Sequence, residues 1–178
     1  SLRVMRPRPV RGFPGCEIGA FVVAIACVGW GCERLIHTGP FHSGLGYDSD
    51  WWNDFRVGDD IPIHPADDLY ALTKYLGNDI TRIFAEEHNL EVLTFLYCHF
   101  RTREILPEER GKGIHPYVSS WEDTGEGFLY GLRAGAIPSP YETFFMCSRL
   151  PHDKYRPDKA KRLLGWEAKD TFEELFSR

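Results

Sequence analysis

The sequence contains no apolar run long enough to span a bilayer. Its longest run, residues 18–30, has 13 residues and includes two glycines, whereas a spanning helix needs about 20 apolar residues. It has no excess of basic charge either: 21 Lys and Arg stand against 26 Asp and Glu, a formal net charge of −5. A nucleic-acid partner usually leaves a basic footprint, so this class of function receives no support.

The cysteines lack the spacing of a disulfide framework or a zinc site. There are five, an odd number, and no two are separated by only two residues. Free thiols in a reducing compartment are therefore expected, which favours a cytoplasmic location.

The length of 178 residues fits one ordinary domain, or a modest domain plus a small appendage. We expect an irregular basic segment over 1–16, an α/β part over 17–100 and a part of different character over 101–178, which the resemblance described below implies is a substrate-binding or lid region. Residues 17–31 predict a buried helix, because they are apolar on nearly every side. Residues 33–38 predict a strand, and residues 40–64 an aromatic loop of functional character.

The clearest element is a helix after Pro65. An apolar stripe recurs at three- and four-residue spacing along it: Leu69, Leu72, Leu76, Ile80, Ile83 and Phe84. Asp67 and Asp68 stand at its start, where carboxylates cap free N–H groups. The apolar residues 91–98 that follow predict a buried strand.

The rest of the chain alternates helices and strands. Ser120 and Asp123 resemble a capping box with Asp in place of Glu, and they open a helix that extends to about Ala134. A strand is expected over 141–147, a helix over 157–164 stopped by Gly165, and a final helix over 171–175. This order predicts a parallel sheet covered by helices, an α/β fold.

The helix after Pro65 carries a pair of residues that could perform acid–base chemistry. Tyr70 and Lys74 lie four positions apart, hence on one helix face. Tyrosine is a poor base at neutral pH, since its unperturbed pKa is about 10. A neighbouring ammonium favours the phenolate and makes a tyrosine a usable proton shuttle. Tyr155 and Lys159 have the same spacing, but Pro157 argues against one continuous helix there.

Three ordered segments resemble the extended short-chain dehydrogenase/reductases, the NAD-dependent epimerase/dehydratase family. Residues 65–100 resemble its Tyr-x-x-x-Lys helix and following strand, residues 31–39 the strand before its active-site hydroxyl, and residues 159–176 its C-terminal signature. Residues 115–132 and the C-terminal segment resemble the uronate dehydrogenase-like branch.

The resemblance implies the C-terminal part of a Rossmann-type doubly wound parallel sheet, followed by a small α+β substrate-side subdomain. It implies an oxidoreductase or epimerase/dehydratase that uses NAD or NADP and acts by hydride transfer on a sugar or sugar-nucleotide substrate. Tyr70 would be the acid/base and Lys74 its ribose-binding partner; Cys98 and His99 would lie beside the cofactor. The family also implies a homodimer that forms through the helix bearing the tyrosine.

The chain departs from this family in two places. The family's active-site serine falls on or beside Pro40, which has no donor, so Thr38 and Ser43 are the nearby hydroxyls that could replace it. The glycine-rich turn that holds the pyrophosphate is absent, which implies that the chain starts inside the Rossmann domain. The alternatives are a catalytically inactive binding or assembly module, or a product with no independent fold.

Other ligand sites are less well supported by the sequence. His37, His42 and His64 lie near aspartates without metal-ligand spacing, so no metal site is predicted. Trp51 and Trp52 could form a sugar platform, although packing under the helix is the default. An aspartate-rich stretch lacks the spacing of a calcium loop: Asp48, Asp50, Asp59 and Asp60.

Overall fold

A parallel sheet of three strands forms the centre of the molecule. The computed structural model describes residues 16–40, 57–59 and 61–176. Strands β1 (Arg34–Pro40), β3 (Glu91–Tyr97) and β6 (Tyr141–Phe145) pair in the order β1-β3-β6. The middle strand is buried from Val92 to Tyr97, as its apolar run predicts for a strand covered on both faces.

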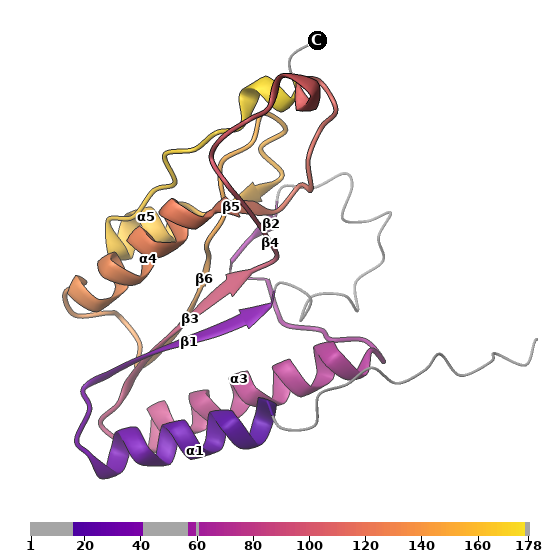
Figure 1. Ribbon diagram of the computed structural model, residues 1–178. Coiled ribbons are helices and arrows are strands. Elements are labelled where there is room, and N and C mark those ends of the chain that lie inside the picture. Colours follow the sequence, from indigo (N-terminus) through magenta and orange to yellow (C-terminus); the bar gives the residue numbers. More distant parts are fainter. Residues whose placement is uncertain (1–15, 41–56, 60, 177–178) are drawn as a thin grey trace, which may run out of the picture.

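Helices cover both faces of this sheet (Figure 1). The pair α1 (Cys16–Gly29) and α3 (Leu69–Glu87) lies side by side on one face, and α4 (Trp121–Arg133) and α5 (Asp158–Leu164) lie on the other. The predicted α/β class and its parallel, doubly covered sheet are thus confirmed.

Two short parallel pairings extend the structure beyond the carboxyl ends of the central strands. Strand β2 (Val57–Gly58) pairs with β7 (Tyr155–Arg156), and β4 (His99–Arg101) pairs with β5 (Val118–Ser120). Two 3-10 turns, η2 (Pro107–Glu109) and η3 (Glu173–Leu175), complete the described elements. The final helix predicted over 171–175 is therefore only a single 3-10 turn.

The predicted helix starts are capped, although one of them differs in detail. Asp68 Oδ1 accepts from the Ala71 N–H at 2.8 Å, and Ser120 Oγ accepts from the Asp123 N–H at 3.0 Å. The Asp123 carboxylate does not close a capping box; it accepts from the Lys169 and Asp170 N–H groups, each at 3.0 Å. It therefore ties α4 to the C-terminal segment rather than to its own cap.

Helix α4 approaches the sheet closely through two glycines. A Cβ at Gly127 would lie 2.6 Å from Met146 Cε, and one at Gly131 would lie 2.6 Å from Phe95 Cζ. Since no real Cβ comes so close to another carbon, any larger residue would push the helix or the core apart.

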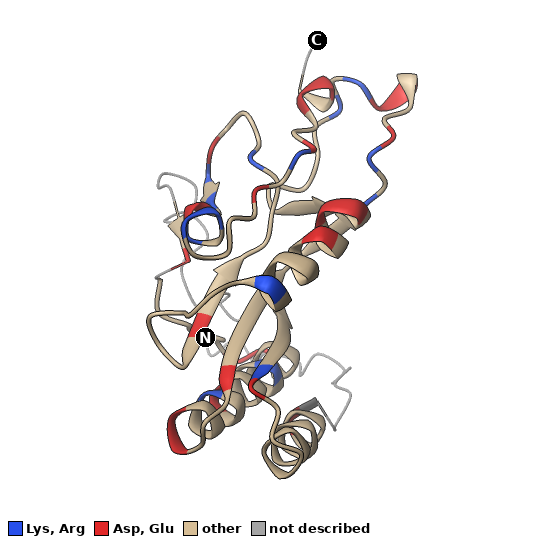
Figure 2. Cartoon of the chain, turned by 90° about the vertical axis from the view of Figure 1, so that its left-hand side faces the viewer, with Lys and Arg blue, Asp and Glu red and all other residues tan. Residues whose placement is uncertain are grey.

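One prediction about burial is wrong. Helix α1 is not buried all round, because a set of its apolar side chains is 47–64% exposed: Ile18, Phe21, Val22, Val23 and Ile25. Figure 2 shows that α1 is nearly devoid of charged residues; only Glu17 carries a charge. The apolar stripe from which the helix α3 is predicted is also largely exposed, at Leu69, Leu72, Leu76 and Ile83.

Small and polar residues form the buried face of α3: Ala71, Gly77, Asn78, Thr81 and Ala85. A close helix-on-sheet contact selects small side chains, whereas a hydrophobicity pattern points to the bulky ones. Among the described helices, none is both long and apolar enough to cross a membrane.

Candidate active site

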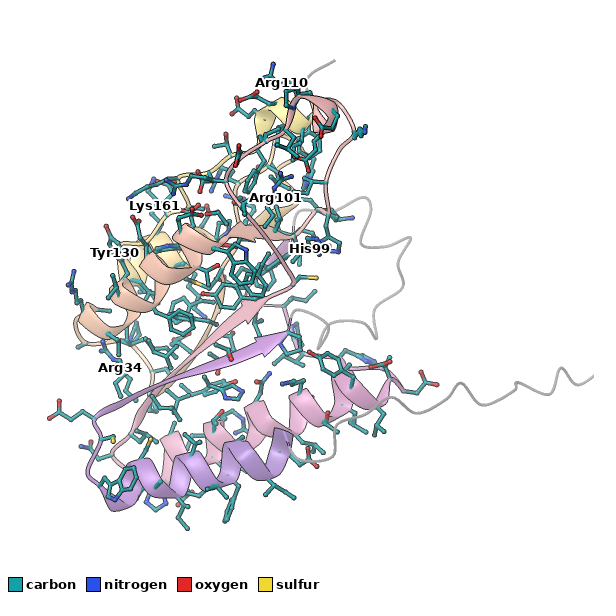
Figure 3. All side chains as sticks on the ribbon, in the orientation of Figure 1. Arg34, His99, Arg101, Arg110, Tyr130 and Lys161 are labelled. Atoms are coloured by element: carbon teal, nitrogen blue, oxygen red, sulfur yellow. The ribbon has the colours of Figure 1, made fainter. Side chains whose placement is uncertain are left out.

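A cavity of about 290 Å³ opens at the carboxyl ends of β1 and β3, between α3 and α4. Its described lining residues are Thr38, Gly39, Pro40, Tyr70, Lys74, Tyr97, Cys98, Phe100, Trp121, Thr124 and Phe128. Figure 3 shows His99 near this end of the sheet and Arg34 at the opposite end. Parallel α/β sheets characteristically bind ligands beyond the carboxyl ends of their strands.

Tyr70 and Lys74 enter the cavity from the first turns of α3. The Asp68 cap fixes the start of this helix, and both side chains lie on its cavity side. The Lys74 Nζ lies 5.7 Å from the centroid of the Tyr70 ring, within the range of a cation–π contact. Tyr70 is 40% exposed, so a ligand in the cavity can reach it.

The second Tyr-x-x-x-Lys match has no comparable geometry. Tyr155 lies in β7 and Lys159 in α5, on separate elements. Lys159 forms a half-buried ion pair with Glu142 at 2.5 Å. The expectation that Pro157 prevents one continuous helix there is confirmed.

The end of β1 forms a second side of the cavity through Thr38, Gly39 and Pro40. A Cβ at Gly39 would lie 3.1 Å from Asn78 Oδ1 and 3.1 Å from Leu96 Cδ2, so the strand approaches α3 closely at this point. Thr38 is exposed and presents a hydroxyl, whereas Pro40 offers no donor.

A partly buried histidine lies just before these residues on β1. Burial lowers the pKa of His37, the neighbouring Asn78 amide acts in the opposite direction, and the positive charge of Lys74 lowers it further. The lowered pKa favours an uncharged His37 ring at neutral pH. Lys74 is then the positively charged side chain among the described residues that line the cavity.

The end of β3 contributes Tyr97 and Cys98. Burial raises the pKa of the Tyr97 hydroxyl well above its usual range and also raises the pKa of the Cys98 thiol. The Cys98 Sγ lies 3.8 Å from His115 Nε2. His99 is not among the lining residues; its ring stacks on that of His115, with centroids 5.4 Å apart.

Aromatic side chains form the wall opposite α3. Phe100 and Trp121 stack with centroids 4.8 Å apart and an interplanar angle of 12°. Phe128 stacks on Tyr97 with centroids 6.3 Å apart. Trp121 is 57% exposed, so this wall presents a flat apolar surface at the mouth of the cavity.

The structure thus brings four of the predicted site residues to one cavity: Thr38, Tyr70, Lys74 and Cys98. Ser43 lies outside the described residues, as do His42, Trp51 and Trp52. Within the described ranges no group of three or more His, Cys, Asp or Glu side chains could hold a metal ion.

Sequence reasoning missed the aromatic wall. Tyr97 directly precedes Cys98 at the end of β3. The argument that placed Cys98 in the site, its position at the end of a strand, therefore applies to Tyr97 as well. Trp121, Thr124 and Phe128 recur at spacings of three and four, which places them on one face of α4.

Solved structures of other proteins, two of them with NAD bound, share this fold. Glucuronic acid dehydrogenase from Chromohalobacter salexigens superposes with a TM-score of 0.70 at 21% identity, covering 96% of this chain and 59% of that one. A short-chain dehydrogenase/reductase superfamily protein from Agrobacterium tumefaciens with bound NAD gives 0.69 at 15% identity, covering 97% and 74%. UDP-glucuronic acid 4-epimerase from Bacillus cereus in complex with NAD gives 0.66 at 13% identity, covering 90% and 65%.

The chain therefore spans 59% to 74% of the length of these structures. No family model and no curated protein matches the sequence. The likeness establishes the Rossmann-type α/β fold that the sequence predicts.

Proposed function

We propose that this chain carries the acid–base half of a nicotinamide-dependent oxidoreductase or epimerase/dehydratase site. The supporting observation is the cavity in which Thr38, Tyr70 and Lys74 meet at the carboxyl ends of parallel strands. The proposed substrate is a sugar or a sugar nucleotide, in keeping with what the structural neighbours named above are said to act on.

The cavity suits the nicotinamide and ribose end of NAD or NADP. Lys74 supplies a charged donor for ribose hydroxyls, and the rings of Tyr97 and Phe100 suit a flat nicotinamide ring. The described residues contain no glycine-rich turn for the pyrophosphate, so this fit concerns one end of the cofactor. When bound, the cofactor would accept or donate the hydride.

Tyr70 would hold and move the proton. Its hydroxyl exchanges a proton with the substrate hydroxyl or carbonyl, and the ammonium of Lys74 stabilises the phenolate that forms. Thr38 would hydrogen-bond the same substrate oxygen, in place of the serine that the family has beside Pro40. Cys98, with His99 behind it, would border the cofactor.

The two parts of the chain would share these tasks. Residues 17–100 supply the strands and the helix that bear Thr38, Tyr70 and Lys74, and residues 101–178 supply α4 and its aromatic side chains. We assign cofactor binding to the first part and substrate contact to the second, because the flat surface of Trp121 suits the apolar face of a sugar ring.

The test is calorimetric titration of the folded chain with NAD⁺ and with NADP⁺. Binding at about micromolar strength is expected for one of them, and Lys74→Met should weaken it about tenfold or more, because a hydrogen bond from a charged donor contributes about 1.5–3 kcal/mol. Tyr70→Phe should retain binding and abolish turnover of a sugar substrate.

Two variants serve as controls in that experiment. Tyr75→Phe removes a hydroxyl from the same helix outside the cavity lining, and Lys161→Met removes an exposed lysine from α5. Both should bind as the unmodified chain does. A folded chain that binds neither nucleotide would exclude the proposal and leave the binding or assembly module.

A second role, self-association, is favoured by the exposed apolar side chains of α1 and α3. Ile18 is 64% exposed and Leu76 43% exposed, and the two helices lie side by side. Apolar patches of this kind on a folded surface mark interaction sites. We propose that a second copy of this chain covers them, giving a homodimer through the helix that bears Tyr70.

A further inference from the structure

A cysteine and a histidine that the proposed reaction does not use meet at the edge of the cavity. Cys98 lines the cavity, and its Sγ lies 3.8 Å from His115 Nε2, across 17 positions of sequence. A thiol within reach of an imidazole nitrogen is the arrangement by which cysteines are activated as nucleophiles.

The backbone of Tyr117 orients the imidazole. The Nδ1 of His115 lies 3.0 Å from the Tyr117 carbonyl oxygen and 3.1 Å from its nitrogen. In the neutral tautomer whose Nε2 can take a proton, Nδ1 carries the ring hydrogen and donates it to the Tyr117 carbonyl oxygen, and it does the same in the protonated ring. Both states of the proton acceptor thus have a backbone partner, while Nε2 faces the sulfur.

The charge of the cavity favours a reagent that carries an anion. Lys74 is the one charged side chain among the described lining residues, and its ammonium attracts a negative group. Tyr97 lines the cavity as well, but its hydroxyl is buried and lies toward α4, 3.5 Å from where a Cβ at Gly127 would be.

The other described cysteines lack this setting. Cys147 is fully buried, and burial raises the pKa of its thiol. Cys27 and Cys32 are partly buried and face each other; burial raises the pKa of Cys27 as well. None of these three cysteines lines the cavity.

We propose that Cys98 is a site of reversible thiol–disulfide exchange with small disulfides that carry a carboxylate, with His115 as the proton acceptor. The Cys98 sulfur attacks one sulfur of R–S–S–R, the S–S bond of the reagent breaks, and a Cys98–S–S–R bond forms. The leaving thiolate takes the proton that His115 removed from Cys98, so one disulfide and one thiol yield one mixed disulfide and one thiol.

Burial at the cavity edge opposes this reaction, and the histidine offsets that opposition. The raised pKa of Cys98 keeps the free thiol protonated. Exchange therefore depends on proton transfer to His115 as the sulfur attacks, and it should become slower when that side chain is removed. The inference does not depend on cofactor binding, because the exchange is measured without a nucleotide.

The experiment measures mixed-disulfide formation at each cysteine by mass spectrometry after digestion. The probes are dithiodipropionate, which is anionic, and cystamine, which is cationic and of similar size. In the unmodified chain Cys98 should react with dithiodipropionate about tenfold faster than Cys27, Cys32 or Cys147. It should react more slowly with cystamine, and Lys74→Met should remove that preference.

Two histidines provide the matched variants. His115→Ala should slow the exchange at Cys98 about tenfold, and added imidazole should restore the rate, which a purely structural role would not allow. His88→Ala removes an exposed imidazole after α3 that does not line the cavity, and it should leave the reaction unchanged.

Several results would overturn the proposal. Cys98 reacting no faster than Cys27 would exclude an activated thiol, and an unchanged or increased rate in His115→Ala would exclude the histidine as proton acceptor. Equal rates with both probes would exclude the preference for a carboxylate. Rates measured in urea, where the chain is unfolded and every thiol is exposed, supply the reference for the intrinsic reactivity of each cysteine.

Discussion

Two glycines of one helix determine how close α4 can lie to the sheet. Because a Cβ at Gly131 would lie 2.6 Å from Phe95 Cζ and 3.0 Å from Ile36 Cδ1, Gly131→Ala should destabilise the protein by about 1–3 kcal/mol. Chemical denaturation followed by circular dichroism measures this change.

A third glycine of α4 is the control. Gly125 has nothing within 4 Å of its would-be Cβ, so Gly125→Ala should stabilise the helix by up to about 1 kcal/mol through its better helix propensity. Equal effects of the two substitutions, in either direction, would contradict the close helix–sheet contact.

At this same scale the sequence located part of the cavity and missed the rest. Tyr70, Lys74, Thr38 and Cys98 follow from a motif and from strand ends, which are local features. Phe100 and Trp121 stack only because β4 and β5 pair, and this pairing joins segments that no local pattern relates. The 3.8 Å approach of Cys98 to His115 depends on that pairing as well.

The helices show where hydrophobic patterning misleads. In α3 the period of the bulky apolar residues is helical, yet the sheet contacts the small residues that include Ala71, Asn78 and Ala85. The pattern therefore predicts the existence and bounds of the helix but selects the wrong face. In α1 uniform hydrophobicity predicts burial on all sides, whereas Val22 and Ile25 remain exposed in one copy of the chain.

A prediction about association follows from these two helices. If a second copy covers them, the chain should sediment as a dimer, and Leu76→Glu or Val22→Glu should convert it to a monomer, because a buried unpaired carboxylate is costly. Analytical ultracentrifugation over a range of concentrations measures this change.

Helix α4 offers a matched control for that experiment. Leu132 is 62% exposed on the opposite layer of the molecule, so Leu132→Glu should leave the dimer unchanged. A monomer at every concentration, or dissociation by Leu132→Glu as well, would argue against an interface at α1 and α3.

For the molecule as a whole, stability should fall as the solution becomes more acidic. The folded state lowers the pKa of His37 by burial, whereas in the unfolded chain it returns to about 6.5. Below that pH the unfolded chain takes up a proton that the folded chain does not, so the free energy of unfolding decreases. Burial lowers the pKa of His152 too, which adds an effect of the same sign.

Urea denaturation at about pH 7.5 and about pH 5.5 brackets the titration of histidine. His37→Gln should reduce the loss of stability between the two, and His88→Gln, at an exposed position after α3, should not. An unchanged difference in His37→Gln would mean that its ring is not held neutral in the fold.

The all-parallel sheet has a consequence for how the chain must fold. Arg34 pairs with Glu91, 57 positions away, and β2 finds its partner β7 only near the other end of the described chain. No described strand pairs through a tight hairpin, so each ladder requires the closure of a long loop before it gains any hydrogen bond. Such a topology folds slowly and leaves strand edges open in the meantime. Low temperature and low protein concentration during refolding should therefore raise the yield of native chain at the expense of aggregate.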